Sequence, residues 1–170
     1  MASFRVAVLT VSDKGSVGER VDTSGPAIAD LIEGVGGQVV DVGMVPDERD
    51  QISAQLRSWA DQGGIDLILT TGGTGLAPRD VTPEATLDVA ERLVPGFAEL
   101  MRAKSREKTP LADVSRAVVV TRGNTLIVNL PGSERGAREN LEAILGILPH
   151  AAEVVRGDVG DHTASSVEQA

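Results

Sequence analysis

Leu69 to Thr86 reads LTTGGTGLAPRDVTPEAT, and this stretch decides how the rest of the chain can fold. It starts at the end of an apolar run, passes through three glycines, and reaches Thr82-Pro83, a hydroxyl followed by a proline at a helix start. Glycines leave main-chain N–H groups free to converge on an anion, and without Cβ atoms a phosphate can come close. The stretch is therefore either a plain turn between a strand and a helix or one part of an anion site.

Apolar runs on both sides of this stretch predict the remaining strands. Runs rich in β-branched residues predict strands at 4–11, 38–45 and 65–70. Two further short strands, at 117–121 and 125–128, are separated by Arg122-Gly123-Asn124, a turn that favours an antiparallel pair. The region from 14 to 23 has little periodicity, and we expect a loop there.

Amphipathic segments alternate with these strands and predict helices. Ser24 is expected to cap one helix, and Trp59 lies on the apolar face of the next. A helix that begins at Thr82 is expected to be interrupted by Pro95 and then to resume, and a long one follows Ser133, with a shorter one from Pro149 to 156. Nearly all-apolar strands alternating with helices predict an α/β fold of three layers, α/β/α, around a mostly parallel open sheet with a short antiparallel strand pair.

Composition excludes several classes of protein. The 170 residues carry a formal net charge of -9 and only 2% aromatic residues, so the chain lacks both the basic stripe and the stacking platforms that binding to nucleic acid needs. The absence of cysteine excludes disulfides, thiolate catalysis and Cys-ligated metals. His150 and His162 have no partner pattern, so we expect no zinc site and no histidine-dependent mechanism.

The chain is expected to be one domain at 1–156 followed by a flexible acidic tail at 157–170. No apolar run approaches the ~20 residues needed to span a bilayer, and the N-terminus enters a strand-like segment without a signal peptide. We therefore expect a cytoplasmic protein with no membrane partner.

Polar groups follow several of the predicted strands at the point where each strand ends. Because right-handed crossovers bring all strand-to-helix loops to one edge of a parallel sheet, these groups are expected to lie together, where ligands bind in such sheets. The groups are Ser12 and Asp13, Asp47, the segment from Gly72 to Asp80 with Gly73, Thr74 and Gly75, and Pro131, Gly132 and Ser133.

Two of these side chains are candidate metal ligands. Asp47 and Asp80 follow successive strands, and paired carboxylates beside a phosphate cradle suit Mg²⁺ bound to a nucleotide. Each aspartate is alternatively a helix cap. Arg79 either neutralises phosphate charge or is simply solvated, and the helix entry at Pro131-Gly132-Ser133 either binds an anion or is only a cap. There is no GxxxxGK[ST], no GxGxxG after the first strand and no GxSxG.

These residues carry a family likeness. TTGGTGLAPRDVTPEAT, preceded by VPDE and followed by TLIVNLPGS, resembles the molybdopterin-binding adenylyltransferases of molybdenum cofactor biosynthesis and the gephyrin G domain. The likeness runs from about Phe4 to Arg156, with SGP near Ser24 and SR at Ser115-Arg116 in the same order. The combination of GGTG-x(4)-DVTP with a downstream LPG is quite specific.

The resemblance implies a three-layer fold that assembles as a homotrimer, and a reaction in which MgATP and molybdopterin give adenylylated molybdopterin and pyrophosphate. It implies that Asp47 and Asp80 are the catalytic, metal-binding aspartates and that Gly72 to Gly75 hold the pterin phosphate. It also implies substrate-side serines at Ser105 and Ser115, and it points to the molybdenum insertion protein as a further partner. Beyond Mg²⁺ and the co-substrate ATP, no tightly bound organic cofactor is expected.

The sequence is also compatible with two other functions. The chain could be a molybdopterin-binding or scaffold paralogue without turnover, since a fold does not determine a function. It could also hydrolyse a nucleotide or a pterin instead of transferring AMP.

Overall fold

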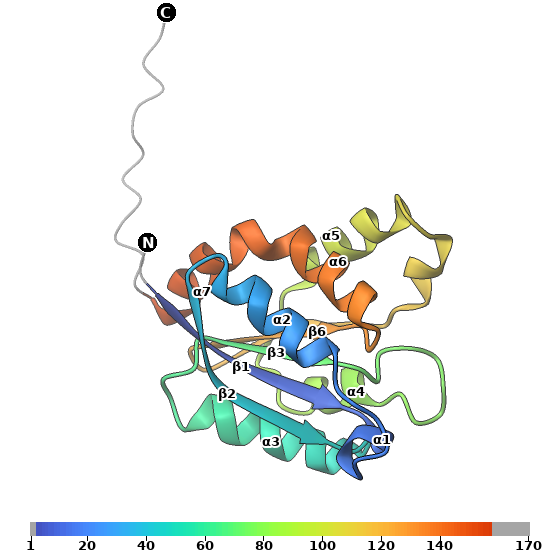
Figure 1. Ribbon diagram of the computed structural model, residues 1–170. Coiled ribbons are helices and arrows are strands. Elements are labelled where there is room, and N and C mark those ends of the chain that lie inside the picture. The colour runs from blue at the N-terminus through green and yellow to red at the C-terminus, as the bar shows by residue number, and fades with distance from the viewer. Residues whose placement is uncertain (1–2, 158–170) are drawn as a thin grey trace, which may run out of the picture.

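A computed structural model describes residues 3–157 of the chain (Figure 1). Its six-stranded sheet has the strand order β2-β1-β3-β6-β5-β4, in which β2, β1, β3 and β6 run parallel while β5 and β4 are antiparallel to their neighbours. This confirms the predicted α/β fold with its antiparallel pair. The strands are β1 (Phe4–Val11), β2 (Gly37–Val45), β3 (Leu67–Thr71), β4 (Arg92–Leu93), β5 (Val119–Arg122) and β6 (Thr125–Leu130).

Helices cover both faces of the sheet, as Figure 1 shows. The helices are α1 (Asp13–Ser16), α2 (Ser24–Glu33), α3 (Arg49–Asp61), α4 (Thr82–Leu87), α5 (Pro95–Arg106), α6 (Glu134–Ile144) and α7 (Leu148–Arg156), with 3-10 turns η1 (Pro110–Val114) and η2 (Leu145–Ile147). Among the described residues, no helix is both long enough and apolar enough to cross a membrane.

Two hydrophobic cores lie on opposite faces of the sheet, because successive strand residues point to opposite sides. On β1, Val6 and Val8 join the core formed with α2, α5, α6 and α7, whereas Ala7 and Leu9 join the core formed with α3 and α4. Trp59 belongs to the second core, as predicted, and its indole N–H donates to Asp41 over 3.0 Å. The sheet is therefore buried on both faces, which explains the nearly continuous apolar strands.

Three local predictions were wrong. The expected loop after β1 begins with the short helix α1, because Ser12 accepts a hydrogen bond from the N–H of Gly15 and caps it. Ser24 does not cap α2: the carboxylate of Asp22 accepts from the N–H groups of Ser24 and Gly25, each over 3.0 Å. Pro95 does not interrupt a helix, since α4 already ends at Leu87.

The segment between α4 and α5 instead forms β4, the short edge strand of the sheet. The main-chain N–H groups of Glu91 and Val94 donate to β5 on either side of β4, so the chain is held extended there. Pro95 then occupies the start of α5, where a missing N–H costs nothing. The predicted tail begins with Gly157, which ends α7 in a left-handed conformation; residues 158–170 lie outside the described part of the chain.

Candidate functional site

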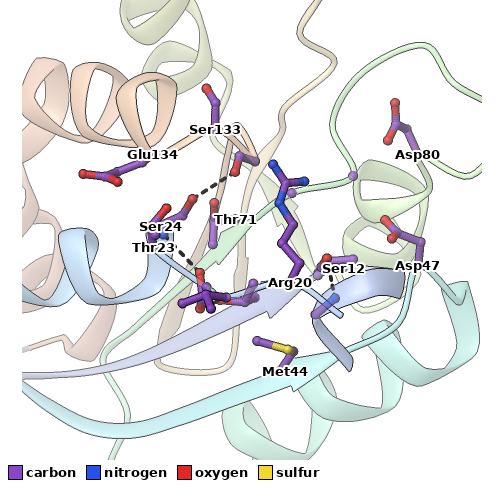
Figure 2. Close-up of a pocket in the computed structure, with 18 residues that line it drawn as sticks. Ser12, Arg20, Thr23, Ser24, Met44, Asp47, Thr71, Asp80, Ser133 and Glu134 are labelled. Atoms are coloured by element: carbon purple, nitrogen blue, oxygen red, sulfur yellow. Dashed lines mark hydrogen bonds between the residues drawn. The ribbon is translucent and has the colours of Figure 1, made fainter. Parts of the chain in front are cut away.

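The carboxyl ends of β1, β2, β3 and β6 surround a cavity of about 410 Å³ (Figure 2). This edge of the sheet is where the sequence places its polar groups, and most of them meet there. The predicted residues that line the cavity are Ser12, Asp47, Gly72, Gly73, Asp80, Gly132 and Ser133. Other residues that line the cavity were not predicted as site residues, and they include Arg20, Asp22, Ser24, Thr71 and Glu134.

The glycine loop has a backbone that other residues would not tolerate. Gly72 has φ +105°, and a Cβ atom there would lie 2.2 Å from the carbonyl oxygen of Val11. Gly73 has φ +66°, and a Cβ there would lie 2.3 Å from Oγ1 of Thr82. Thr82 in turn donates its hydroxyl to the carbonyl of Gly72 over 2.8 Å, which ties the loop to the first turn of α4. The loop is therefore closely packed against β1 and α4.

Three main-chain donors of this loop make no hydrogen bond to the described protein. Within the described chain, the main-chain N–H groups of Gly73, Thr74 and Gly75 donate to no protein acceptor. Only Gly72 and Gly73 line the cavity itself, while Thr74 is buried and its carbonyl accepts from the N–H of Arg116. The arrangement supports the predicted backbone cradle for an anion, with Gly73 at the cavity wall.

Asp47 and Asp80 both approach the glycine loop. A Cβ atom on Gly73 would lie 3.2 Å from Oδ1 of Asp47, and one on Gly75 would lie 2.7 Å from Oδ2 of Asp80. Burial raises the pKa of Asp47 above its usual value, and the charges of Asp13 and Asp80 raise it further. Two carboxylates that face one cavity in this way repel each other until a cation or proton lies between them.

Neither aspartate caps the helix that follows it in the chain, so that alternative reading is wrong. The N-cap residue of α3 is Glu48 and that of α4 is Val81, and neither helix has a side-chain capping bond. Asp80 instead accepts from the N–H of Ala77 over 3.0 Å, within its own loop.

Asp13 and Arg79 lie beside the cavity without lining it. Arg79 makes a two-pronged ion pair with Asp13, through Nε at 3.0 Å and Nη2 at 2.7 Å, and also contacts Glu48 at 2.9 Å. The hydrogen bond from Arg79 lowers the pKa of Asp13, which keeps that carboxylate ionised. Arg79 is thus engaged by protein carboxylates, and in this structure its charge is directed at them rather than at the cavity.

The remaining predicted residues lie elsewhere. Ser105 is buried in the last turn of α5, beside a separate cavity of about 310 Å³ that Lys108 and Glu139 also line. Its hydroxyl has no hydrogen-bond partner among residues 3–157. Ser115 follows η1, and its hydroxyl accepts from the N–H of Ala117 over 3.4 Å. Pro131 accepts the hydroxyl of Thr71 at its carbonyl, 2.7 Å away. None of the three lines the cavity at the strand ends.

The donor set suits Mg²⁺ carried in by a phosphate ligand. In residues 3–157 there is no group of three or more His, Asp or Glu side chains that could hold a metal ion. An ion at Asp47 and Asp80 would therefore need further oxygen ligands from the substrate. Mg²⁺ commonly binds in this way, through one or two carboxylates, water and substrate phosphates.

Comparison with known proteins agrees with this geometry. The family described as "Probable molybdopterin binding domain" matches residues 7–150, which include the whole of the cavity. The chain belongs to this family. Its relatives include the molybdopterin adenylyltransferase of Helicobacter pylori strain J99, which is 39% identical over 160 residues that cover 93% of this chain and 91% of that protein. The molybdenum cofactor synthesis protein cinnamon of Drosophila melanogaster is 43% identical over 160 residues, and the chain spans 27% of its length.

Solved structures of similar proteins share the fold. The molybdopterin biosynthesis enzyme MoaB of Thermus thermophilus superposes with a TM-score of 0.86 at 58% identity, covering 91% of this chain and 97% of that one. The tungsten cofactor synthesizing protein MoaB of Pyrococcus furiosus superposes with a TM-score of 0.81 at 33% identity, covering 91% and 98%.

Arg116 supports the loop that follows Gly75 from outside the cavity, and this role was not predicted. Its guanidinium donates to the carbonyls of Gly75 (2.8 Å) and Asp80 (2.6 Å), and it pairs with Glu84 on α4. One side chain thus joins both ends of the loop from 75 to 80 to the following helix. The SR motif marks the residue in the sequence, but only the folded chain shows what it contacts.

Proposed function

We propose that this protein is a molybdopterin adenylyltransferase, a nucleotidyltransferase that transfers AMP from MgATP to the terminal phosphate of molybdopterin and releases pyrophosphate. The observation that carries the proposal is the pair Asp47 and Asp80, which face one cavity beside a glycine loop with free N–H donors. Relatives about 40% identical that bear this enzyme's name support it, including the proteins of Helicobacter pylori and of Escherichia coli K12.

The reaction needs positioning and charge neutralisation more than a base. The attacking phosphate oxygen of molybdopterin is ionised at neutral pH, so no histidine is required; it attacks the α-phosphorus of ATP, and the bond from that phosphorus to the pyrophosphate leaving group breaks. The N–H groups of the glycine loop would hold the pterin phosphate in place. Mg²⁺, when bound by Asp47 and Asp80, would neutralise charge on the nucleotide phosphates.

We further propose a homotrimer in the cytoplasm that passes its product to the molybdenum insertion protein. These statements rest on the family likeness. A non-catalytic molybdopterin-binding or scaffold paralogue is the alternative, and both carboxylates at the cavity argue against it.

The test is to incubate the protein with MgATP and molybdopterin and to measure both pyrophosphate and adenylylated pterin. Formation of both in equal amounts supports the proposal. Pyrophosphate release in the absence of the pterin would point to nucleotide hydrolysis, and pterin binding without either product would point to the paralogue without turnover.

A further inference from the structure

The cavity has an unfavourable charge for the substrates assigned to it. Its charged lining residues are four carboxylates, Asp22, Asp47, Asp80 and Glu134, and one guanidinium, that of Arg20. Molybdopterin and ATP both bring phosphate groups, and like charges in a partly enclosed site repel strongly. Mg²⁺ would offset part of this charge, and any protein cation in the cavity becomes correspondingly important.

The other arginines near the site already pair with groups of the protein. Arg79 is held by Asp13 and Glu48, and Arg116 by Glu84 and two main-chain carbonyls. Neither one lines the cavity.

Arg20 differs from both. It lies in the loop between α1 and α2, it is exposed, and within the described residues it has no hydrogen bond and no ion pair. Figure 2 shows its side chain reaching into the cavity, with the guanidinium group between the side that carries Ser133 and the side that carries Asp80.

Asp22, two residues away, does not neutralise Arg20. Its Oδ1 accepts from the N–H groups of Ser24 and Gly25, and its Oδ2 accepts the hydroxyl of Thr10 over 2.6 Å. These bonds fix the chain directly after Arg20 against β1 and the start of α2. The arginine is therefore anchored at its base while its charged end is left without a partner.

We propose that Arg20 is a substrate-binding residue that holds the phosphate chain of the nucleotide through charge-assisted hydrogen bonds. This inference rests on the proposed function. The nucleotide is the better ligand for Arg20 because the pterin phosphate already has the N–H groups of the glycine loop, whereas the triphosphate has only the metal to balance several negative charges. A guanidinium suits this role because its planar set of donors binds phosphate oxygens in pairs.

Binding of magnesium pyrophosphate, measured by titration calorimetry on the full chain, tests the inference. We expect Arg20→Gln to weaken this binding about 10-fold to 100-fold, the usual range for a lost charge-assisted contact. The affinity of Arg20→Lys for pyrophosphate should lie between that of the wild type and that of Arg20→Gln, because lysine keeps the charge but loses the paired contact. Added KCl should weaken binding more in the wild type than in Arg20→Gln. Molybdopterin binding should change much less than pyrophosphate binding.

Arg57→Gln is the matched control, since this exposed arginine on α3 is absent from the cavity lining and its loss changes the net charge equally. Thermal unfolding should be the same for all variants. The inference is overturned if the wild type binds no pyrophosphate, if Arg20→Gln binds it like the wild type, if both glutamine variants lose affinity equally, or if only molybdopterin binding falls.

The proposed function and the proposed role of Arg20 can be disproved independently of each other. If the wild type forms no adenylylated pterin yet its pyrophosphate binding depends on Arg20, the proposed function is wrong and the role of Arg20 stands. If the wild type forms the product and Arg20→Gln matches it in both assays, the role of Arg20 is wrong and the proposed function stands.

Discussion

Asp13 and Asp47 hold each other through a reciprocal pair of hydrogen bonds. The main-chain N–H of Asp13 donates to Oδ2 of Asp47 over 2.8 Å, and that of Asp47 donates to Oδ1 of Asp13 over 3.0 Å. The two residues follow β1 and β2, which are neighbours in the sheet, and the ion pair with Arg79 fixes Asp13 in turn. The orientation of the proposed metal ligand Asp47 therefore depends on a residue that does not line the cavity.

This dependence can be measured. We expect Asp13→Ala to raise the Mg²⁺ concentration for half-maximal adenylyl transfer about 10-fold, as the loss of a group that orients a metal ligand commonly does. Asp13→Asn should have a smaller effect, because its amide oxygen can still accept from the N–H of Asp47. Equal Mg²⁺ requirements in the wild type and both variants would contradict a positioning role.

Asp80 is expected to be essential for transfer. Asp80→Ala should abolish the formation of adenylylated pterin and leave molybdopterin binding largely intact, because main-chain N–H groups rather than this carboxylate would hold the pterin phosphate. Asp30→Ala, an equal change of charge on the exposed face of α2, should leave both unchanged. Full activity of Asp80→Ala would remove this residue from the proposed mechanism.

The glycine at 72 is predicted to be irreplaceable for stability. Gly72→Ala should lower the free energy of unfolding by about 3 kcal/mol or more, because it combines a strained φ with a clash against the carbonyl of Val11. Gly96→Ala is the control, since nothing lies within 4 Å of a Cβ there, and in the first turn of α5 it should be neutral or stabilising by up to about 1 kcal/mol. Denaturant titration of the wild type, Gly72→Ala and Gly96→Ala measures these free energies of unfolding. A loss well below about 3 kcal/mol in Gly72→Ala would mean that the glycine loop relaxes to accept the methyl group.

The pair of Glu84 and Arg116 should make stability depend on pH in acid. The hydrogen bond from Arg116 lowers the pKa of Glu84 below its ordinary value of 4.5. A pKa that is lower in the folded state means that the pair stabilises the fold fully above pH 4.5 and loses this contribution as the pH falls through the lower, folded value. Since both side chains are partly exposed, the contribution is on the order of 1 kcal/mol or less.

Melting temperatures of the wild type and Glu84→Gln should therefore differ at pH 7 and converge as the pH falls below 4.5. The exposed Glu99→Gln on α5 should follow the wild type at every pH. A difference that is constant across this range would show that the amide disturbs the loop for another reason than the lost charge.

Much of the fold could be read from local patterns. Apolar runs and helical spacing locate the core strands and helices because burial on two faces of a sheet leaves a strong periodic signature. The helix and the strand that the sequence did not predict are both short. The strand β4 has two exposed residues, Arg92 and Leu93, and it forms because its neighbours bond to β5, which is distant in sequence. The helix α1 depends on one capping hydroxyl, that of Ser12.

The sequence places Asp47, Asp80 and the glycines after strand ends, and a parallel sheet brings strand ends to one edge. The sequence therefore predicts a site at this edge, and the cavity lies there. Which charges face the cavity depends on the folded chain. Arg79, beside Asp80 in the sequence, pairs with Asp13, whereas Arg20, in a loop without a periodic pattern, reaches inward. Long charged side chains on loops take the direction set by partners from other strands, and those partners become neighbours only when the chain has folded.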